Sequence, residues 1–236
     1  MNNTKGHITT SRKDVAGSQQ LSQLSSRHLR GCLPSLRSVY LHLKADLIRY
    51  QGEGRAKFIK HFLFTPGYKY TVWMRLTGWA HRSKLRKYTL GLPFKFVLRH
   101  LRYKYGIAIP EYTEIGPGFF INRFGGIYIN GDAIIGNNVN IAQMSMIGQA
   151  NRGTRAGSPI VGDRVYIGVG SALVGRISVG NDVIVGTGAV MSSDIPDMSV
   201  VSGNPGKILH SRGSAYYVNR LVPDELLEIC RLSRER

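Results

Sequence analysis

The sequence predicts a left-handed parallel β-helix of hexapeptide repeats, preceded by an α-helical region and followed by a short C-terminal helix. Three observations predict this mainly-β fold: aliphatic residues every six positions after Tyr105, helical apolar spacing before it, and a helix-start motif near the end. We therefore expect four parts: a flexible polar tail (1–35), a basic α-helical domain (36–105), the β-helix domain (106–209) and a C-terminal extension (210–236).

The N-terminal half begins with a polar stretch and then becomes helical. Residues 1–27 are rich in Ser, Thr, Gln and Asn, which predicts a flexible tail. Apolar residues then recur at spacings of three and four, as an amphipathic helix from about Leu36 to Tyr50 requires. We expect further helices at 57–64 and 68–82, and a fourth toward Tyr103 that Gly91 and Pro93 kink or split.

After Tyr105 the chain shows a six-residue period, with a two-residue expansion near Phe124 and a longer interruption at 149–158. Neither a helix nor a strand has this period, whereas a three-sided β-coil uses one hexapeptide per side. The periodic residues should point inward and stack on neighbouring coils. Glycine often follows them, and we expect Gly and Asn to occupy corners that need positive φ. The periodic residues are Ile109, Ile115, Ile121, Ile129, Ile135, Ile141, Ile147, Val161, Ile167, Leu173, Val179, Val185 and Met191.

The end of the chain and the cysteines add two expectations. Val222-Pro223-Asp224-Glu225 predicts a helix with proline and acids in its first turn, continuing to about Arg234. A bridge between Cys32 and Cys230 is possible but not required, so a reduced, cytoplasmic setting is the simpler interpretation. The sequence has no apolar run of about eighteen residues and no secretory signal at its start, which agrees with that location.

The net charge of +18 is concentrated in the first half, where residues 1–105 hold 21 Lys and Arg against three acids. No aromatic-basic motif accompanies this charge, so it does not predict nucleic-acid binding. An anionic membrane surface, a polyanionic acceptor and a solvated surface without a partner all remain open. Residues 84–104 would suit a helix at the inner face of the cell membrane, although a helix packed on the domain is the favoured interpretation.

A short β-helix leaves flat faces exposed, so we expect a homotrimer with ligand grooves between neighbouring prisms. The two interruptions in the repeat, Phe124-Gly-Gly-Ile127 and 149–158, are candidate groove walls because loops on a rigid scaffold often carry function. The second loop contains Arg152 and Arg155.

Several motifs in and around the repeat resemble a known family, over roughly residues 46–220. They are Ile107-Ala-Ile-Pro110, Ile115-Gly-Pro-Gly118, Phe124-Gly-Gly-Ile127, Ile135-Gly-Asn-Asn-Val-Asn-Ile141, Ile147-Gly-Gln149, Asn151-Arg-Gly153, Asp194-Ile-Pro-Asp197 and Val201-Ser-Gly-Asn-Pro-Gly-Lys207, with Trp73-Met-Arg75 and Tyr103-Lys-Tyr-Gly106 in the flank. The chain resembles the serine O-acetyltransferase branch of the hexapeptide acyltransferases, in particular the members found in bacterial capsule and exopolysaccharide gene clusters. The resemblance implies O-acetyl transfer from acetyl-CoA, without a metal, to a small-molecule or lipid-linked saccharide or to L-serine.

The resemblance also implies catalytic positions, and three of them are changed here. The family histidine that takes the proton of the acceptor hydroxyl falls at Arg123, next to Asn122. The aspartate that orients it falls at Ala108, and a second family histidine falls at Ser158. Because arginine stays protonated, Arg123 cannot be a general base, but it could bind an anionic acceptor or stabilise an oxyanion.

The identity of the general base therefore stays open. The repeat contains no histidine, which also excludes the three-histidine zinc site of a β-helix carbonic anhydrase. His100 precedes the first coil, and the acids Glu111, Glu114 and Asp132 lie on the coils, where we expect them to be solvated. The alternative to an enzyme is a trimeric β-helix scaffold that has lost catalysis at Arg123.

The coenzyme positions implied by the resemblance are less altered. Backbone amides near Gly148, Val169 and Thr187 should bind the pantetheine arm. Lys207 matches the family's basic residue that faces the nucleotide phosphates, and Arg155 on the loop could assist it.

Overall fold

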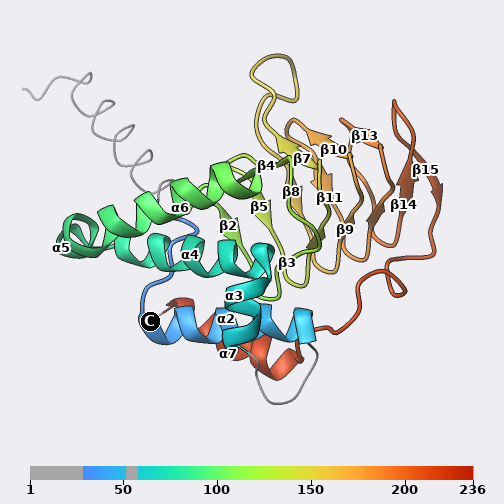
Figure 1. Ribbon diagram of the computed structural model, residues 1–236. Helices are drawn as coiled ribbons and strands as arrows, with labels where there is room; N and C mark the ends of the chain where they lie inside the picture. The colour runs from blue at the N-terminus through green and yellow to red at the C-terminus, as the bar shows by residue number, and fades with distance from the viewer. Residues whose placement is uncertain (1–28, 52–57, 236) are drawn as a thin grey trace, which may run out of the picture.

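The computed structural model describes residues 29–51 and 58–235, so most of the predicted polar tail lies outside the described residues. The fold is the predicted left-handed parallel β-helix, with helices covering one end of the prism (Figure 1). The helices before the coils are α2 (Leu36–Gln51), α3 (Phe58–Phe64), α4 (Pro66–His81), α5 (Lys84–Arg86), the π-helix η1 (Lys87–Gly91) and α6 (Leu92–Tyr105). The predicted split of the fourth helix is confirmed, because η1 ends at Gly91 and Pro93 lies in the first turn of α6.

Three sheets of parallel strands form the sides of the prism, and each of the first four coils contributes one short strand to each sheet. Sheet 1 contains β1 (Ile107–Ala108), β4 (Ile127–Ile129), β7 (Met146–Gly148), β10 (Ala172–Val174) and β13 (Val190–Met191). Sheet 2 contains β2 (Glu114–Ile115), β5 (Ile134–Ile135), β8 (Ile160–Val161) and β11 (Ser178–Val179). Sheet 3 contains β3 (Phe120–Ile121), β6 (Asn140–Ile141), β9 (Tyr166–Ile167), β12 (Ile184–Val185), β14 (Val200–Ser202) and the antiparallel β15 (Lys207–His210).

The six-residue period sets the core of the prism, as predicted. Ile147 pairs with Leu173, and Leu173 pairs with Met191, so periodic residues of successive coils stack on one another. All thirteen are buried, with exposed fractions of 2% or less. The prism is therefore a continuous column of aliphatic side chains, which the hydrophobic effect holds together.

The predicted reason for the glycines is wrong at most positions. Gly116, Gly136, Gly162 and Gly180 do not have positive φ. A Cβ at each of them would lie 2.2–2.8 Å from an atom of the next coil, so these glycines are required by close contact between coils. The left-handed conformation occurs two residues later at the same corner, in the column Gly118, Asn138, Arg164, Asp182 and Met198.

The helices satisfy the open edge of the first coil with buried polar side chains. The hydroxyl of Tyr70 accepts from the amide of Ile109 at 3.1 Å and donates to its carbonyl at 2.8 Å. Tyr50 makes the same pair of contacts with Ile121, at 3.1 and 3.3 Å. Arg75 donates to the carbonyls at 115 and 116. An unpaired strand edge invites aggregation, so these contacts both attach the helices and protect the prism.

After β15 the chain runs back to the helical end of the prism. It follows the corner whose residues have the left-handed conformation. Gly213 donates to the carbonyl of Met198 at 2.8 Å, and Val222 donates to Oδ1 of Asn138 at 3.0 Å. The predicted C-terminal helix, α7 (Asp224–Glu235), then packs on α2. The contact buries Ala45, Ile48, Val222, Leu226 and Cys230.

Cys32 and Cys230 are both buried, and neither forms a disulfide in the described part of the chain. Burial raises the pKa of the Cys32 thiol to about 12 and that of Cys230 to about 11. Within the described ranges, no helix is both long enough and apolar enough to cross a bilayer.

Candidate active site

Most of the candidate site residues lie at two corners of the prism that flank the outer face of sheet 1. We call the turns that lead from sheet 3 into sheet 1 the first corner, and the turns that lead from sheet 1 into sheet 2 the second corner. Their positions follow from the strand order and from backbone hydrogen bonds between coils. Loops ejected from a rigid repeat are favourable places for binding groups, because the coils fix their starting points.

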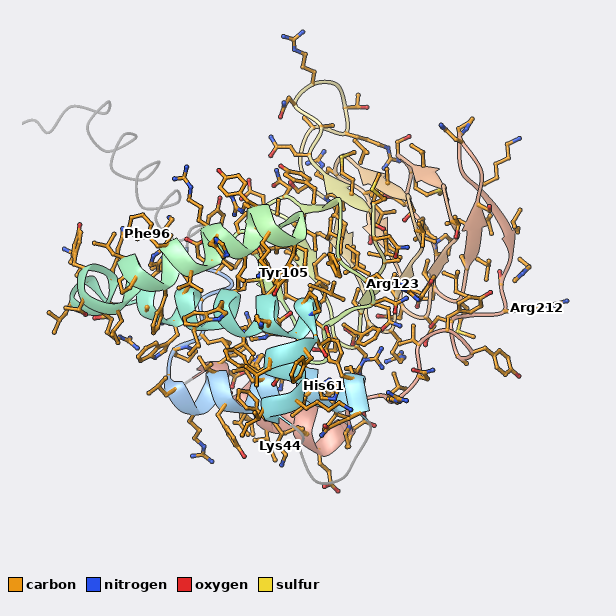
Figure 2. All side chains as sticks on the ribbon, in the orientation of Figure 1. Lys44, His61, Phe96, Tyr105, Arg123 and Arg212 are labelled. Atoms are coloured by element: carbon orange, nitrogen blue, oxygen red, sulfur yellow. The ribbon has the colours of Figure 1, made fainter. Side chains whose placement is uncertain are left out.

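The first corner contains Arg123 and Asn122, both with exposed side chains (Figure 2). The amide of Asn122 donates to the carbonyl of Ile141 at 3.0 Å, which keeps this turn in register with the next coil. The two-residue expansion follows directly. Its Phe124 ring lies 5.8 Å from the ring of Tyr105, the last residue of α6, measured between centroids. The turn at Arg123 is thus attached to the end of the helical domain.

The same corner continues through Gln143, Val169 and Thr187 in successive coils. Gly170 donates to the carbonyl of Gln143 at 3.1 Å, and Gly188 donates to the carbonyl of Val169 at 2.8 Å. The structure therefore brings the predicted catalytic position and two of the predicted coenzyme positions to one edge of the prism.

Gln143 is a residue of this corner that sequence reasoning missed. Its side-chain oxygen is buried and has no hydrogen-bond partner among the described residues. A buried polar atom without a partner is costly, so it marks a place where a ligand or water is expected. The available sequence signal was a glutamine at the turn position that Val169 and Thr187 occupy in the next two coils.

The second corner contains Gly148, Ser158 and the loop between them. Gly148 is buried at the end of β7, and its carbonyl accepts from Gly175 at 3.0 Å. Arg155 extends from the loop and pairs with Asp194 at 3.1 Å. Ser158 donates to Oδ1 of Asn130 at 3.0 Å. Arg123 and Ser158 are consequently on opposite edges of sheet 1 within one chain.

Between the corners, the outward side chains of sheet 1 form a single column. Ala108 pairs with Tyr128, and Tyr128 pairs with Met146 in the next coil. Ala172 and Val190 continue the column. Tyr128 and Met146 are 44% and 39% exposed, so this face presents apolar groups to solvent beside the two polar corners.

The expectation that Glu111 is solvated is wrong. Its carboxylate is buried, with Nδ1 of His81 at 3.1 Å and Nζ of Lys95 at 3.3 Å from Oε1. Burial alone would raise the pKa of Glu111, but the hydrogen bonds from His81 and its own backbone amide and the charge of Lys95 lower it to about 2. A carboxylate with this pKa is a poor general base at neutral pH.

The other candidate bases lie in different places. Glu114 pairs with Arg30 at 3.2 Å, and His100 is exposed on α6. Asp132 is half-buried at the second corner, where its amide donates to the same Asn130 oxygen that Ser158 contacts. Asp132 thus shares a hydrogen-bond acceptor, Asn130, with the changed family position Ser158.

Lys207 is the first residue of β15, the strand at the end of the prism opposite the helices (Figure 1). It is exposed at the start of β15 and pairs with Ser202 across the β14–β15 hairpin. No group of three or more His, Cys, Asp or Glu that could hold a metal occurs in the described part of the chain.

Comparison with known proteins gives a consistent result. No protein-family model matches the chain. A serine acetyltransferase of Synechocystis sp. is 36% identical over 162 residues, which are 66% of this chain and 64% of that protein. A serine acetyltransferase of Staphylococcus epidermidis is 30% identical over 163 residues, which are 67% of this chain and 74% of that protein.

The chain belongs to the serine acetyltransferase family. A solved serine acetyltransferase in complex with CoA has the same fold, with a TM-score of 0.61 and 22% identity over 74% of this chain and 71% of that one. The match spans less than two thirds of the length of the first curated relatives, 64% and 63% for two of them. The family predicted from the sequence is therefore confirmed, whereas the association with capsule or exopolysaccharide stays a prediction.

Proposed function

We propose that this serine acetyltransferase family member is an acetyl-CoA-dependent O-acetyltransferase. The observation that carries the proposal is the first corner, where an exposed cation at Arg123 lies on the same prism edge as Val169 and Thr187. The names of the curated relatives and the CoA complex of the solved structure support the same activity.

The first corner fits a pantetheine arm. The amides of Val169 and Thr187 donate no hydrogen bond to the residues that the structure describes. A Cβ at Gly170 or at Gly188 would meet nothing within 4 Å, so the backbone at this corner is open to a ligand. Exposed amides in successive coils can donate to the amide oxygens of an extended chain. We propose that Val169 and Thr187 bind the pantetheine, with Lys207 toward the nucleotide phosphates and Gly148 and Arg155 at the second corner.

Acetyl-CoA would supply the thioester that the acceptor hydroxyl attacks. Arg123 carries a permanent positive charge, so in our proposal it binds an anionic acceptor or stabilises the oxyanion, and Asn122 assists as a hydrogen-bond donor. We propose a sugar hydroxyl of an exopolysaccharide precursor, small or lipid-linked, as the acceptor. The basic side chain at Arg123 and the changes at Ala108 and Ser158 favour this acceptor over L-serine, which the relatives' name indicates.

We further propose that the active unit is a homotrimer. Arg123 and Ser158 lie on opposite edges of sheet 1, so a groove that uses both corners needs a neighbouring copy. The exposed apolar column at Tyr128 and Met146 would be buried by such a copy. Cys32 and Cys230 are buried and form no disulfide in the described structure, which supports a cytoplasmic location.

Release of free CoA thiol from acetyl-CoA tests the activity. Purified protein is incubated with acetyl-CoA and, in separate reactions, with L-serine and with nucleotide-activated sugars that carry an anionic group. We expect thiol release and an acetylated product of higher mass with a sugar acceptor. Release with L-serine alone would assign serine as the acceptor instead. No thiol release with any acceptor, by protein that still binds CoA, would exclude the enzyme.

Position 123 is an arginine where the family has a histidine. This difference supports a second candidate function, a CoA-binding scaffold without catalysis. The variant Arg123→His separates the two candidates, because it restores the family residue at an exposed turn without disturbing the core. Activity in the wild type that is lost in Arg123→His would give Arg123 a direct role. Activity in the variant alone would identify the natural chain as a non-catalytic relative.

A further inference from the structure

The outward face of α6 carries apolar side chains where a helix on a soluble domain normally carries polar ones. Leu92, Phe96 and Tyr103 are 50%, 70% and 72% exposed, and their spacing places them on one side of the helix. The side of α6 that faces the protein is different, since it buries Leu98 and Leu101. We call Leu92, Phe96, Arg99 and Tyr103 the α6 face. Contiguous exposed apolar groups of this kind mark an interaction surface.

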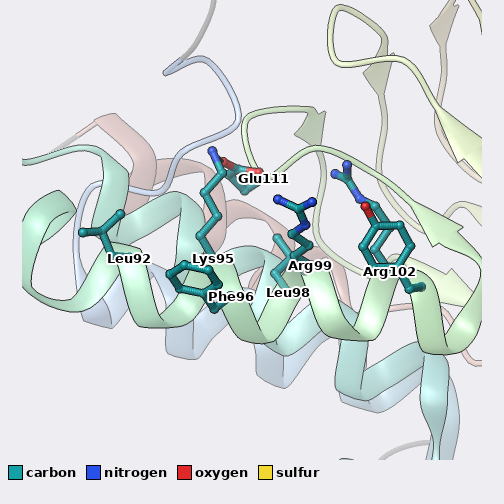
Figure 3. A pocket seen from close by; sticks show the side chains of 8 residues that line it. Leu92, Lys95, Phe96, Leu98, Arg99, Arg102 and Glu111 are labelled. Carbon is teal, nitrogen blue, oxygen red and sulfur yellow. Dashed lines mark ion pairs between the residues drawn. The ribbon is translucent and has the colours of Figure 1, made fainter.

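Cations lie within the α6 face and along one flank of it. Figure 3 shows Lys95, Arg99 and Arg102 rising from the same side of α6 as Leu92 and Phe96. These residues line a shallow groove of about 290 Å³. A second groove of about 600 Å³ adjoins it and adds Arg82, Lys84 and Lys87 to the shared Lys95. The apolar and the cationic lining meet at Lys95.

Negative charge is almost absent from this region. The sequence contains no Asp or Glu from Gly54 to Pro110. Glu111 lines both grooves, but it is buried, with His81 at its carboxylate and the charge of Lys95 balancing its own. The surface is therefore complementary to an extended anionic plane. It carries few carboxylates that would repel such a plane.

We propose that the α6 face docks this protein onto an anionic phospholipid bilayer. Leucine and aromatic side chains enter the boundary between headgroups and acyl chains, while the bordering Lys and Arg contact phosphates. Leu85 and Tyr88, 75% and 69% exposed on α5 and η1, extend the apolar surface. A nucleic-acid partner fits less well, because the exposed leucines of this surface do not stack on bases.

The orientation of α6 connects this surface to the candidate site. The helix ends at Tyr105, and the Tyr105 ring contacts Phe124, the neighbour of Arg123 (Figure 2). Docking through α6 would bring the first corner near the lipid surface, where a lipid-linked acceptor would be presented. The docking itself does not depend on acetyl transfer, so it can fail or succeed independently of the proposed activity.

Flotation of the full chain with vesicles tests the docking. Phosphatidylcholine vesicles are compared with vesicles that also contain phosphatidylglycerol, at an ionic strength of about 0.15 M. We expect binding to the anionic vesicles only, and at least about tenfold weaker partitioning of Leu92→Ser/Phe96→Ser and of Lys87→Gln/Lys95→Gln/Arg99→Gln. Circular dichroism verifies that each variant is folded.

Two controls remove groups of the same kinds elsewhere. Leu63→Ser/Phe64→Ser removes apolar side chains of α3 that are 51% and 77% exposed. Lys44→Gln/Arg212→Gln removes exposed cations remote from α6 (Figure 2). Both should bind vesicles as the wild type does. Equal binding to neutral and anionic vesicles, α6 variants that bind like wild type, or tighter binding to an RNA or DNA duplex than to vesicles would overturn the proposal.

Discussion

Asp46 and Arg75 form a buried bidentate ion pair, with Nε of Arg75 2.7 Å from Oδ2 of Asp46 and Nη2 3.0 Å from Oδ1. The pair joins α2 to α4, and its remaining hydrogen bonds reach the first coil. Arg75 donates to Gly116 at 2.9 Å, and Phe119 donates its amide to Asp46 at 2.9 Å. One charge pair therefore connects two helices to the open end of the prism.

Replacing one partner of this pair should destabilise the protein strongly. Asp46→Ala leaves the Arg75 guanidinium buried without its counter-charge, and we expect the free energy of unfolding to fall by about 3–5 kcal/mol. Urea denaturation measures the change. If the alanine variant does not fold, the variant Asp46→Asn is measured in its place. The exposed pair of Glu228 with Arg231 provides the control, since Glu228→Gln should leave the midpoint unchanged. An Asp46 variant as stable as wild type would contradict the assigned role.

His42 should make the stability sensitive to acid. Burial, and then the nearby charge of Arg75, lower the pKa of His42 to about 3, although Nδ1 bonds to the Ser38 carbonyl at 2.9 Å. The unfolded chain, with a histidine pKa of about 6.5, takes up the proton first, so stability present above pH 6.5 is lost as the pH falls toward 3.

We expect His42→Leu to reduce this acid-dependent loss by ~4 kcal/mol across that range. Urea denaturation at a series of pH values, compared as differences between variant and wild type, gives the result. Above about pH 7 the difference should be constant, which is the internal control. If the free energy of unfolding falls equally in the wild type and in His42→Leu between pH 7 and pH 4, His42 does not titrate as described.

The glycines that follow the periodic residues should not tolerate a methyl group. A Cβ at Gly136 would lie 2.6 Å from backbone atoms of Gly162, so Gly136→Ala forces adjacent coils apart. We expect a loss of about 1–3 kcal/mol, measured by thermal unfolding. At Gly148 the nearest atom would be 3.4 Å away, and φ is not positive, so Gly148→Ala should unfold near the wild-type temperature. Similar melting temperatures for all three proteins would reject close contact between coils as the reason for these glycines.

Lys207 should contribute to coenzyme affinity rather than to folding. It is exposed on β15, so Lys207→Gln should leave the melting temperature unchanged. We expect Kd for CoA to rise roughly fivefold, because Lys207→Gln removes about 1 kcal/mol of attraction to a phosphate. Titration calorimetry measures the change, and Lys44→Gln on α2 is the matched control. Unchanged affinity in Lys207→Gln would remove Lys207 from the coenzyme site.

The repeat could be predicted from the sequence because its period fits only one architecture. A spacing of six from Ile109 to Met191 fixes which side chains are buried, and also that Val169 and Thr187 occupy equivalent turns. Local signals such as Pro93 and Pro223 likewise mark helix starts, because proline suits the first turn of a helix.

Features that depend on groups remote in sequence could not be predicted in this way. Glu111 is buried because His81 and Lys95 reach it from α4 and α6, which a linear pattern does not reveal. The distance between coils, which explains Gly136, is a tertiary property. The separation of Ser158 from Arg123 depends on which turns lie at the same corner of the prism. A sequence motif gives positions along the chain and does not show at which corner a residue lies.

The return of the chain to α2 has a consequence for biosynthesis. Ala45 and Ile48 are covered by Val222, Leu226 and Cys230, which the ribosome adds only after the last coil. Until then the nascent protein exposes this apolar stripe of α2, although every coil has already been synthesised. A ribosome-bound intermediate with a formed prism and an uncovered α2 would thus be a substrate for chaperones, and shortening the gene by the codons of α7 would make that transient state permanent.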